Sequence, residues 1–221
     1  MMSGNIWKWD QYDLRRFYPG STDYFLDIGG CVGTTSVLFK AIDPWAQVIA
    51  CEPCKEDFEI MKVVAGQWDV RCYNVALGNG EQLCFGRKKQ GAHRFYTSDE
   101  KKWWPETPEY LVPSMTLPQM FKKFNIKGRY NIKVDCEGGE RFLLDDEEAI
   151  AIIRGCVQFN MEYHPGFDHT HEEWNRWFSK FFDTHTMRSR NGKNEGRRAV
   201  FEEIDHVRET WRSEYVLARK A

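Results

Sequence analysis

Apolar positions in the first half of the chain follow two different spacings. Short runs of consecutive apolar residues end at glycine or polar residues, and the segments between them carry apolar side chains three and four positions apart. The first spacing is typical of buried strands and the second of amphipathic helices. The elements predicted for this half are strand 24–28, helix 34–42, strand 47–51, a helix that contains Phe58, Met61, Val64 and Ala65, and strand 70–77, followed by a turn at 78–80 and a hairpin ending near Phe85.

The second half resumes this alternation after an interruption. Periodicity is lost between residues 86 and 110, which predicts a long loop. Thr116 with Gln119, and Thr170 with Glu173, have the spacing of a capping box at a helix start. The elements predicted here are a helix from Thr116 through Phe124, strand 130–134, a turn at 135–140 leading into a helix that runs toward Ile153, strand 157–163, a helix that opens at Thr170 and contains Trp174, Trp177, Phe178 and Phe181, and strands 184–190 and 214–219.

Strands that alternate with helices indicate an α/β fold with a doubly wound, mostly parallel sheet, which binds ligands at the carboxyl ends of its strands. The prediction contains seven strands. No full crossover helix separates the last two, so we expect an antiparallel hairpin at the C-terminal edge. We expect one domain over residues 1–221, with an N-terminal helical segment at 1–22 and a basic, Trp-containing insertion or lid loop at 86–110.

The composition agrees with a globular fold. Hydrophobic residues make up 42% of the chain and charged residues 29%, which is far from the composition of disordered proteins. The formal net charge is -2. A charge this small gives no overall attraction to nucleic acid or membranes, so binding of a polyanion would need a local basic patch.

Membrane insertion and secretion are not predicted. The first twenty residues lack the apolar core of a signal peptide, and no uncharged run reaches the length of about 18 residues that a spanning helix needs. The seven cysteines are an odd number, and most of them fall in predicted buried strands. Cys51 and Cys54 form a C-x-x-C pair, but no second pair stands at zinc-site spacing. We therefore expect a cytoplasmic protein without a metal–thiolate site.

A glycine turn follows the first predicted strand. Gly29, Gly30 and Gly33 have no Cβ, so the backbone there can turn sharply and approach a ligand closely. The helix that starts at Thr34 offers unpaired N–H groups at the same place. This arrangement is typical of nucleotide-binding sheets, and we expect all four residues to contact a cofactor.

Acidic and polar residues near the ends of neighbouring strands suit a nucleoside. Glu52 ends the second strand, where a carboxylate accepts hydrogen bonds from ribose hydroxyls. Asn74, with Val75 beside it, can contact the adenine edge. Asp27 precedes the glycines, and a carboxylate there would repel a dinucleotide diphosphate but attract the cationic aminoacyl end of S-adenosylmethionine. The glycine pattern G-G-x-x-G also differs from the dinucleotide pattern G-x-G-x-x-G. These residues favour S-adenosylmethionine as the cofactor.

Six blocks of sequence, in the same order, resemble the FkbM-type methyltransferase family. The most specific block runs from Lys133 to Glu140. Two features depart from the family pattern: Gly30-Cys31 stands where Ala-Asn is common, and the insertion at 86–110 has no counterpart. The six blocks are 25–33, 52–53, 74–78, 115–117, 132–140 and 162–164.

The resemblance implies a class I methyltransferase fold, which is Rossmann-like, and S-adenosylmethionine-dependent O-methylation of a hydroxyl on a sugar or another small-molecule or glycan acceptor. The residues that occupy the positions of cofactor contacts are Asp27, Gly29, Gly33, Glu52 and Asn74. The residues at the positions of the catalytic mouth are Asp135, Glu137, Glu162 and His164.

Methyl transfer to a hydroxyl needs in-line alignment and removal of a proton. Asp135 and His164 follow adjacent predicted strands, so either could be the base. We favour His164 as a neutral imidazole, oriented by Glu162 or Glu137. Asp135, Glu162 and His164 could instead gather a divalent cation such as magnesium or manganese, a metal site that we do not favour.

The acceptor is not fixed by the sequence. We expect Lys133, Arg94, Trp103 and Trp104 to contact it. The basic insertion could also hold phosphate while its tryptophans stack on bases, so the main alternative is an RNA methyltransferase of the ribose 2′-O or cap type. A second alternative is a catalytically silent nucleotide-binding module. The oligomeric state is left open.

Overall fold

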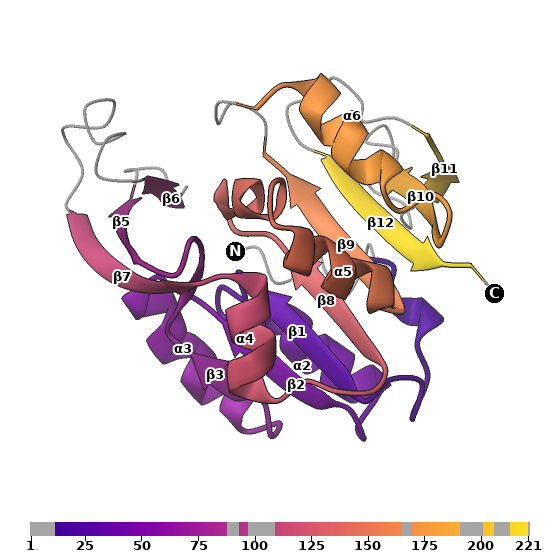
Figure 1. Ribbon diagram of the computed structural model, residues 1–221. Coiled ribbons are helices and arrows are strands. Elements are labelled where there is room, and N and C mark those ends of the chain that lie inside the picture. The colour runs from indigo at the N-terminus through magenta and orange to yellow at the C-terminus, as the bar shows by residue number, and fades with distance from the viewer. Residues whose placement is uncertain are drawn as a thin grey trace.

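The computed structural model describes residues 12–87, 93–96, 109–164, 169–190, 201–205 and 213–220. An eight-stranded sheet crosses the molecule, and a four-stranded sheet lies beside it (Figure 1). The α-helices are α2 Thr34–Ile42, α3 Lys55–Gly66, α4 Leu117–Phe124, α5 Glu147–Gly155 and α6 His171–Ser179, and the 3-10 helices are η1 Leu14–Arg16 and η3 Gly139–Leu143. The strands are β1 Tyr24–Ile28, β2 Gln47–Cys51, β3 Arg71–Tyr73, β4 Ala76–Leu77, β5 Gln82–Arg87, β6 His93–Tyr96, β7 Glu109–Met115, β8 Tyr130–Val134, β9 Gln158–Tyr163, β10 His185–Arg190, β11 Phe201–Glu203 and β12 Ser213–Arg219.

The large sheet has the strand order β11-β10-β12-β9-β8-β1-β2-β3. Strands β3, β2, β1, β8 and β9 are parallel, and β12 pairs antiparallel with both β9 and β10. The predicted doubly wound, mostly parallel sheet is confirmed, including the antiparallel pairing of the last two predicted strands. The structure adds β11 as a short eighth strand. It also places β12 inside the sheet, between β9 and β10.

Helices cover the two faces of this sheet, because its strands carry apolar side chains on both sides. On β1, Leu26 and Ile28 enter the core formed with α4, α5 and α6, whereas Phe25 enters a second core formed with α2 and α3. In Figure 1, α4 and α5 lie in front of the strands and α2 lies behind them. Each fully buried side chain of this size stabilises the fold by about 1.5–3 kcal/mol.

One face of β8 and β9 is polar instead. Asn131 and Lys133 of β8, and Gln158 and Asn160 of β9, are all buried. They alternate with the residues of the apolar core, as strand geometry requires. The segment that begins at Tyr12 lies on this face, where the Tyr12 carbonyl accepts a hydrogen bond from Gln158 Nε2 at 3.1 Å. A strip of buried polar groups therefore leads along the sheet toward the carboxyl ends of its strands.

The prediction of one strand over 70–77 was wrong. Residues 71–73 form β3 at the edge of the large sheet, whereas residues 76–77 form β4 in the small sheet. Asn74 lies between the two strands and donates from Nδ2 to the carbonyls of Glu52 (2.8 Å) and Pro53 (3.0 Å). These bonds turn the chain away from the large sheet, which is why the apolar run does not continue as one strand.

The prediction of a loop over 86–110 was also wrong for its described parts. Residues 93–96 form β6, β5 extends to Arg87, and β7 begins at Glu109. The small sheet has the order β4-β7-β5-β6, and β5 pairs antiparallel with both β6 and β7. Backbone hydrogen bonds between the strands thus hold these charged residues in strands, although the pattern of their side chains did not predict any.

The helix predicted after residue 140 is two helices. The 3-10 helix η3 follows Gly138, whose φ is 108°, and α5 starts separately. Asp146 caps α5 by accepting from the Ala149 N–H at 2.9 Å. The predicted N-terminal helical segment at 1–22 contributes the single 3-10 turn η1 within its described part, and residues 1–11 lie outside the described residues.

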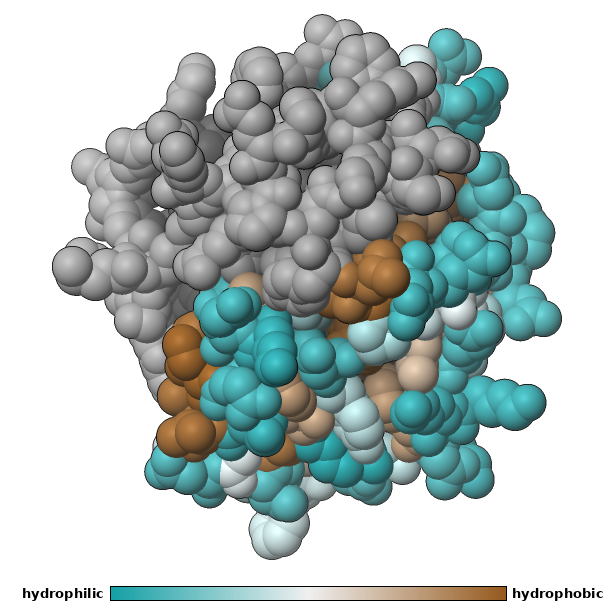
Figure 2. Space-filling model, turned by 90° about the vertical axis from the view of Figure 1, so that its left-hand side faces the viewer, coloured by the Kyte–Doolittle hydropathy of each residue, from teal (hydrophilic) through white to brown (hydrophobic). Residues whose placement is uncertain are grey.

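Among the described residues, none of the helices is both long and apolar enough to cross a bilayer. Figure 2 views the side of the molecule that carries α3 and β7, and its apolar patches are separated by hydrophilic surface. Exposed apolar residues on α3 include Ile60, Val63 and Val64. The six cysteines whose side chains are described are free thiols.

Candidate active site

The glycine turn after β1 packs tightly against its neighbours. Gly29 has a φ of 78°, and a Cβ built there would lie 1.7 Å from the carbonyl oxygen of Asp135. Gly30 and Gly33 face α3, and a Cβ on either would lie 2.9 Å from a side-chain atom of that helix. Glycine is thus required first by internal packing, which brings the end of β8 directly against the turn.

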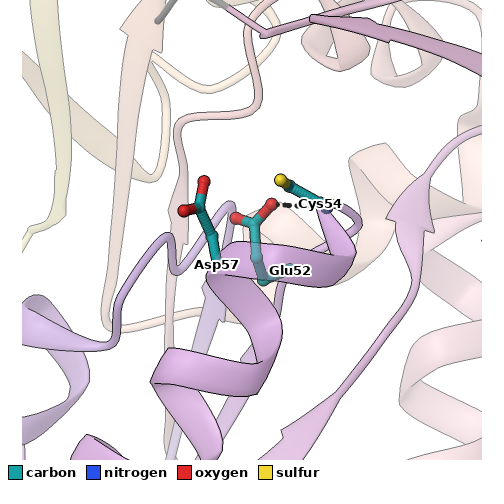
Figure 3. A group of neighbouring side chains, drawn as sticks. All are labelled: Glu52, Cys54 and Asp57. Carbon is teal, nitrogen blue, oxygen red and sulfur yellow. Dashed lines mark hydrogen bonds between the residues drawn. The ribbon is translucent and has the colours of Figure 1, made fainter. Parts of the chain in front are cut away.

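Glu52 lies at the end of β2, next to this turn. Its Oε2 accepts from the Cys31 N–H at 2.8 Å, and its Oε1 accepts from the Cys54 N–H at 2.7 Å. Burial raises the pKa of Glu52 to about 7, although the two N–H groups favour the charged form. Figure 3 shows Glu52 with Cys54 and Asp57 at the start of α3. The atoms of these three residues that could bind a metal ion, one from each residue, lie within 4.8 Å of one another.

This end of the site fits the nucleoside part of S-adenosylmethionine. Each oxygen of a carboxylate has two lone pairs, so Glu52 can accept from ribose hydroxyls while it keeps its backbone bonds. Asn74 is half-buried beside it, and Thr34 is half-buried at the first turn of α2. Val75, in contrast, packs into the main core and presents almost no side-chain surface.

We predicted that Asp27 contacts the cofactor, but in the structure its carboxylate does not face an open site. It is fully buried, accepts from Ser36 Oγ at 2.7 Å, and lies 3.1 Å from the Lys133 ammonium. Lys133 also donates to the Gly29 carbonyl at 2.7 Å. Burial alone would lower the pKa of Lys133, but Asp27 and Asp135 outweigh burial and raise it. The Lys133 side chain is 3% exposed, so it balances Asp27 inside the sheet and does not present its charge to an acceptor.

Asp135 lies at the mouth of the site, at the end of β8. Its Oδ2 accepts a 2.6 Å hydrogen bond from the Tyr12 hydroxyl and lies 3.8 Å from Lys133 Nζ. The Asp135 side chain is 21% exposed. Burial, followed by the charges of Asp135 and Glu162, raises the pKa of Tyr12 well above its usual value, so the hydroxyl keeps its proton and acts as a donor.

His164, just past β9, is surrounded by carboxylates. Its Nδ1 lies 3.0 Å from Glu140 Oε1, and its Nε2 lies 3.4 Å from Glu137 and 3.5 Å from Glu162. Burial alone would lower the pKa of His164, but Glu140, Glu162 and Glu137 outweigh it and raise the pKa to about 11. At neutral pH this geometry favours imidazolium, which disagrees with the neutral base predicted from the sequence.

The turn from Asp135 to Glu140 holds these carboxylates in place. Glu137 has a φ of 51°, a conformation that residues other than glycine rarely adopt. Glu140 is buried, and its carboxylate accepts from the N–H groups of Cys136 (3.0 Å) and Gly138 (2.7 Å). Strained backbone of this kind is common where a side chain must be held at a functional site.

Among the described residues, the mouth carries more negative than positive charge. Five carboxylates, those of Asp27, Asp135, Glu137, Glu140 and Glu162, surround the cations Lys133 and His164. Possible metal-binding atoms of Asp135, Glu162 and His164 lie within 4.8 Å of one another. The structure thus brings together the three residues that we considered for a divalent cation. The surplus of negative charge also suits a cationic cofactor such as S-adenosylmethionine.

Sequence reasoning missed two residues of this site. Glu140 belonged to the most specific family block, and only the fold shows that it holds His164. Tyr12 lies 123 positions before Asp135, in a segment without a recognisable motif. Of the predicted acceptor contacts, Arg94 lies in β6 with its side chain undescribed, and Trp103 and Trp104 lie outside the described residues.

A parallel sheet with a glycine turn after its first strand and a buried carboxylate at the end of the next is typical of nucleotide-binding folds. The sequence profile of the Methyltransferase FkbM domain matches residues 27–191, most of the 221 residues. The chain therefore belongs to the FkbM methyltransferase family. It is a methyltransferase, and its family implies S-adenosylmethionine as the methyl donor. No curated protein matches the chain significantly.

Solved structures with a similar fold are methyltransferases of several kinds. A precorrin-6y C5,15-methyltransferase from Geobacter metallireducens shares 10% identity over 96% of this chain and 86% of its own, with a TM-score of 0.49. A TehB-like S-adenosylmethionine-dependent methyltransferase from Corynebacterium glutamicum shares 8% identity over 96% of this chain and 88% of its own, with a TM-score of 0.44. A methyltransferase from Pyrococcus furiosus shares 13% identity over 92% of this chain and 78% of its own, with a TM-score of 0.42. The assignment rests on the family match and not on these distant likenesses.

Proposed function

We propose that this methyltransferase O-methylates a hydroxyl of a sugar or another small-molecule or glycan acceptor, with Asp135 as the general base. The observation that carries the proposal is the position of Asp135. Its partly exposed carboxylate ends β8, and its backbone lies against the glycine turn where the cofactor is expected. The His164 side chain is less exposed and is enclosed by carboxylates.

The residues of the site have separate roles in the proposed reaction. S-adenosylmethionine, when bound, supplies an electrophilic methyl group on its sulfonium. The glycine turn and Glu52 hold the nucleoside. Asp135 accepts the proton of the acceptor hydroxyl while the hydroxyl oxygen bonds to the methyl carbon, and the electron pair of the broken C–S bond stays on sulfur. The proton then leaves Asp135 for solvent.

The charge of the mouth supports a neutral acceptor. Among the described residues, Glu137 and Glu162 lie around His164 beside Asp135, and their repulsion of phosphate disfavours a polyanion at the reacting centre. A sugar hydroxyl can instead donate hydrogen bonds to these carboxylates. The basic insertion considered for RNA binding falls largely outside the described residues.

A labelled transfer assay tests the proposal. The protein is incubated with S-adenosylmethionine carrying a trideuterated methyl group and with separate pools of neutral sugars, glycans, phenols, amines and RNA oligonucleotides, and products are found by mass shift. We expect an O-methylated product from a neutral hydroxyl acceptor. Asp135→Asn should lower kcat by about 10²–10⁴-fold, the usual contribution of a general base.

Asp145→Asn is the matched control, because Asp145 is exposed and lies between η3 and α5. It should leave the rate unchanged. Methylation of RNA alone, or of a nitrogen or carbon atom, would overturn the proposed acceptor. Binding of the cofactor without any transfer would support the silent nucleotide-binding module.

A further inference from the structure

Tyr12 reaches the catalytic mouth from outside the family-matched region. The side chain is 3% exposed, and its hydroxyl donates to Asp135 Oδ2 at 2.6 Å. Its ring centroid lies 5.3 Å from the Lys133 ammonium, within the range of a cation–π contact. The FkbM match begins at residue 27. The family pattern therefore gives Tyr12 no role, although it contacts two residues of the site.

The segment around Tyr12 is anchored on both sides. The Tyr12 carbonyl accepts from Gln158 on β9, and Asp13 forms an ion pair with Arg188 on β10. Leu14 is 1% exposed in the core formed with α2 and α3. These contacts fix the backbone at Tyr12, so the position of its hydroxyl is set by the fold and not by an isolated surface rotamer.

The two oxygens of Asp135 have different surroundings. Tyr12 and Lys133 both lie near Oδ2. Oδ1 lies 3.9 Å from Nε2 of His164. A carboxylate held through one oxygen by a fixed donor keeps the other in a constant direction, which is what proton abstraction from a bound hydroxyl requires.

We propose that Tyr12 is a positioning residue that orients Asp135 for methyl transfer, so that the N-terminal segment is part of the active site. This inference rests on the role proposed for Asp135. Tyr12 acts through Asp135, and it needs no contact with the acceptor or the cofactor. Tyr12→Phe removes only the hydroxyl and keeps the ring beside Lys133 and in the core.

A binding experiment tests this without an acceptor. Sinefungin carries an ammonium group where S-adenosylmethionine carries its transferable methyl, and S-adenosylhomocysteine has no charge there. The ratio of their affinities, measured by calorimetry, therefore reports whether a carboxylate faces that position. We expect Tyr12→Phe to lower the preference for sinefungin about three- to tenfold, as expected for loss of one oriented hydrogen bond, while S-adenosylhomocysteine binds as before.

A double-mutant cycle separates positioning from a structural effect. Asp135→Asn alone should also lower the preference for sinefungin, and adding Tyr12→Phe should lower it no further, because the hydroxyl acts only through that carboxylate. Tyr18→Phe is the matched control, since Tyr18 belongs to the same segment but is 66% exposed. It should leave the ratio unchanged. Thermal unfolding of Tyr12→Phe should stay within about 4 °C of the parent.

The outcomes separate this inference from the proposed function. An unchanged ratio in Tyr12→Phe, or equal and additive losses in the two single variants, overturns the role of Tyr12 and leaves O-methylation standing. If the affinity ratios change as expected but no hydroxyl is methylated, the proposed function is overturned and the positioning role of Tyr12 stands. Where a methylated acceptor is found, Tyr12→Phe should lower kcat about tenfold with little change in KM for S-adenosylmethionine.

Discussion

Asp27 and Glu52 both lie at the carboxyl end of a parallel strand, but their carboxylates have different partners. Asp27 is fully buried beside Lys133 and Ser36. Glu52 accepts from two backbone N–H groups, and burial raises its pKa to about 7. Glu52 therefore has acceptor capacity left for a ligand hydroxyl, whereas Asp27 mainly compensates a buried ammonium group.

At the residue scale, Glu52→Gln should weaken S-adenosylmethionine binding. The amide can accept through one atom only, so it loses one of the two backbone bonds and a hydroxyl acceptor of the ribose. Loss of hydrogen bonds to a charged group predicts a rise in Kd of about ten- to hundredfold in calorimetry. Glu59→Gln on the exposed side of α3 is the control and should bind normally. Equal affinities for both variants would show that Glu52 only holds the turn.

The sequence predicted which residues lie at the mouth more accurately than it predicted their ion pairs and charges. Asp135, Glu137, Glu162 and His164 are brought together as predicted, because parallel strands end at one edge. The pairing of Asp27 with Lys133 depends on the register of β1 and β8, which no local pattern encodes. For the same reason, the number of carboxylates around His164, and hence its charge, could not be predicted.

At the scale of elements, strong local signals were read correctly. The capping boxes at Thr116 and Thr170 are present, with both bonds formed in each. The failures lie where long-range pairing decides the structure. Strand β6 is stabilised by pairing with β5, and the break between β3 and β4 depends on bonds from Asn74 to the end of β2.

The separate start of α5 gives a prediction at this scale. Asp146→Ala removes the side chain that accepts from the Ala149 N–H, and loss of such a cap costs about 1 kcal/mol. For a chain of this size, Tm should fall by about 2–4 °C. Asp145→Ala tests whether the effect belongs to the cap, because Asp145 is adjacent and exposed. The cap is not needed if both variants melt at the same temperature.

At the scale of the whole molecule, the two faces of the large sheet differ in polarity along β8 and β9. The face toward α4, α5 and α6 is apolar along β8 and β9, and it holds most of the large buried side chains. The opposite face is polar on the same two strands and carries Lys133 and Asp135 toward the mouth. The alternation of side chains along the strands thus places the apolar core on one face of the sheet and the polar residues of the site on the other.

His185 links the start of β10 to the chain before β9 and makes overall stability depend on pH. Its Nε2 lies 3.1 Å from the Cys156 carbonyl and its Nδ1 lies 2.9 Å from Thr184 Oγ1. Burial lowers the pKa of His185 from its usual 6.5, and Arg219 and Arg154 lower it further, against the opposite effects of the Cys156 carbonyl and Asp183.

Because the folded protein binds this proton less tightly than the unfolded chain does, the stability that His185 contributes is fully present above pH 6.5 and falls as the pH drops below it. Glu52, whose pKa burial raises to about 7, contributes in the opposite direction over the same range. The effect of His185 is therefore measured by comparison: between pH 7 and pH 5, the denaturation midpoint in urea should change less favourably in the parent than in His185→Gln. His169→Gln, at the start of α6, should retain the full slope. A slope that is the same in the parent and in His185→Gln would assign the pH dependence to other groups.

The position of β12 has a consequence for the order in which the chain can fold during synthesis. β12 follows β10 in sequence but lies between β10 and β9, so β10 has no route into the sheet until β12 has been made. Strands β1, β2, β8 and β9 can pair while translation continues, and β10 has to wait with one edge open. A ribosome that pauses between these two strands would leave an exposed edge able to pair with another nascent chain.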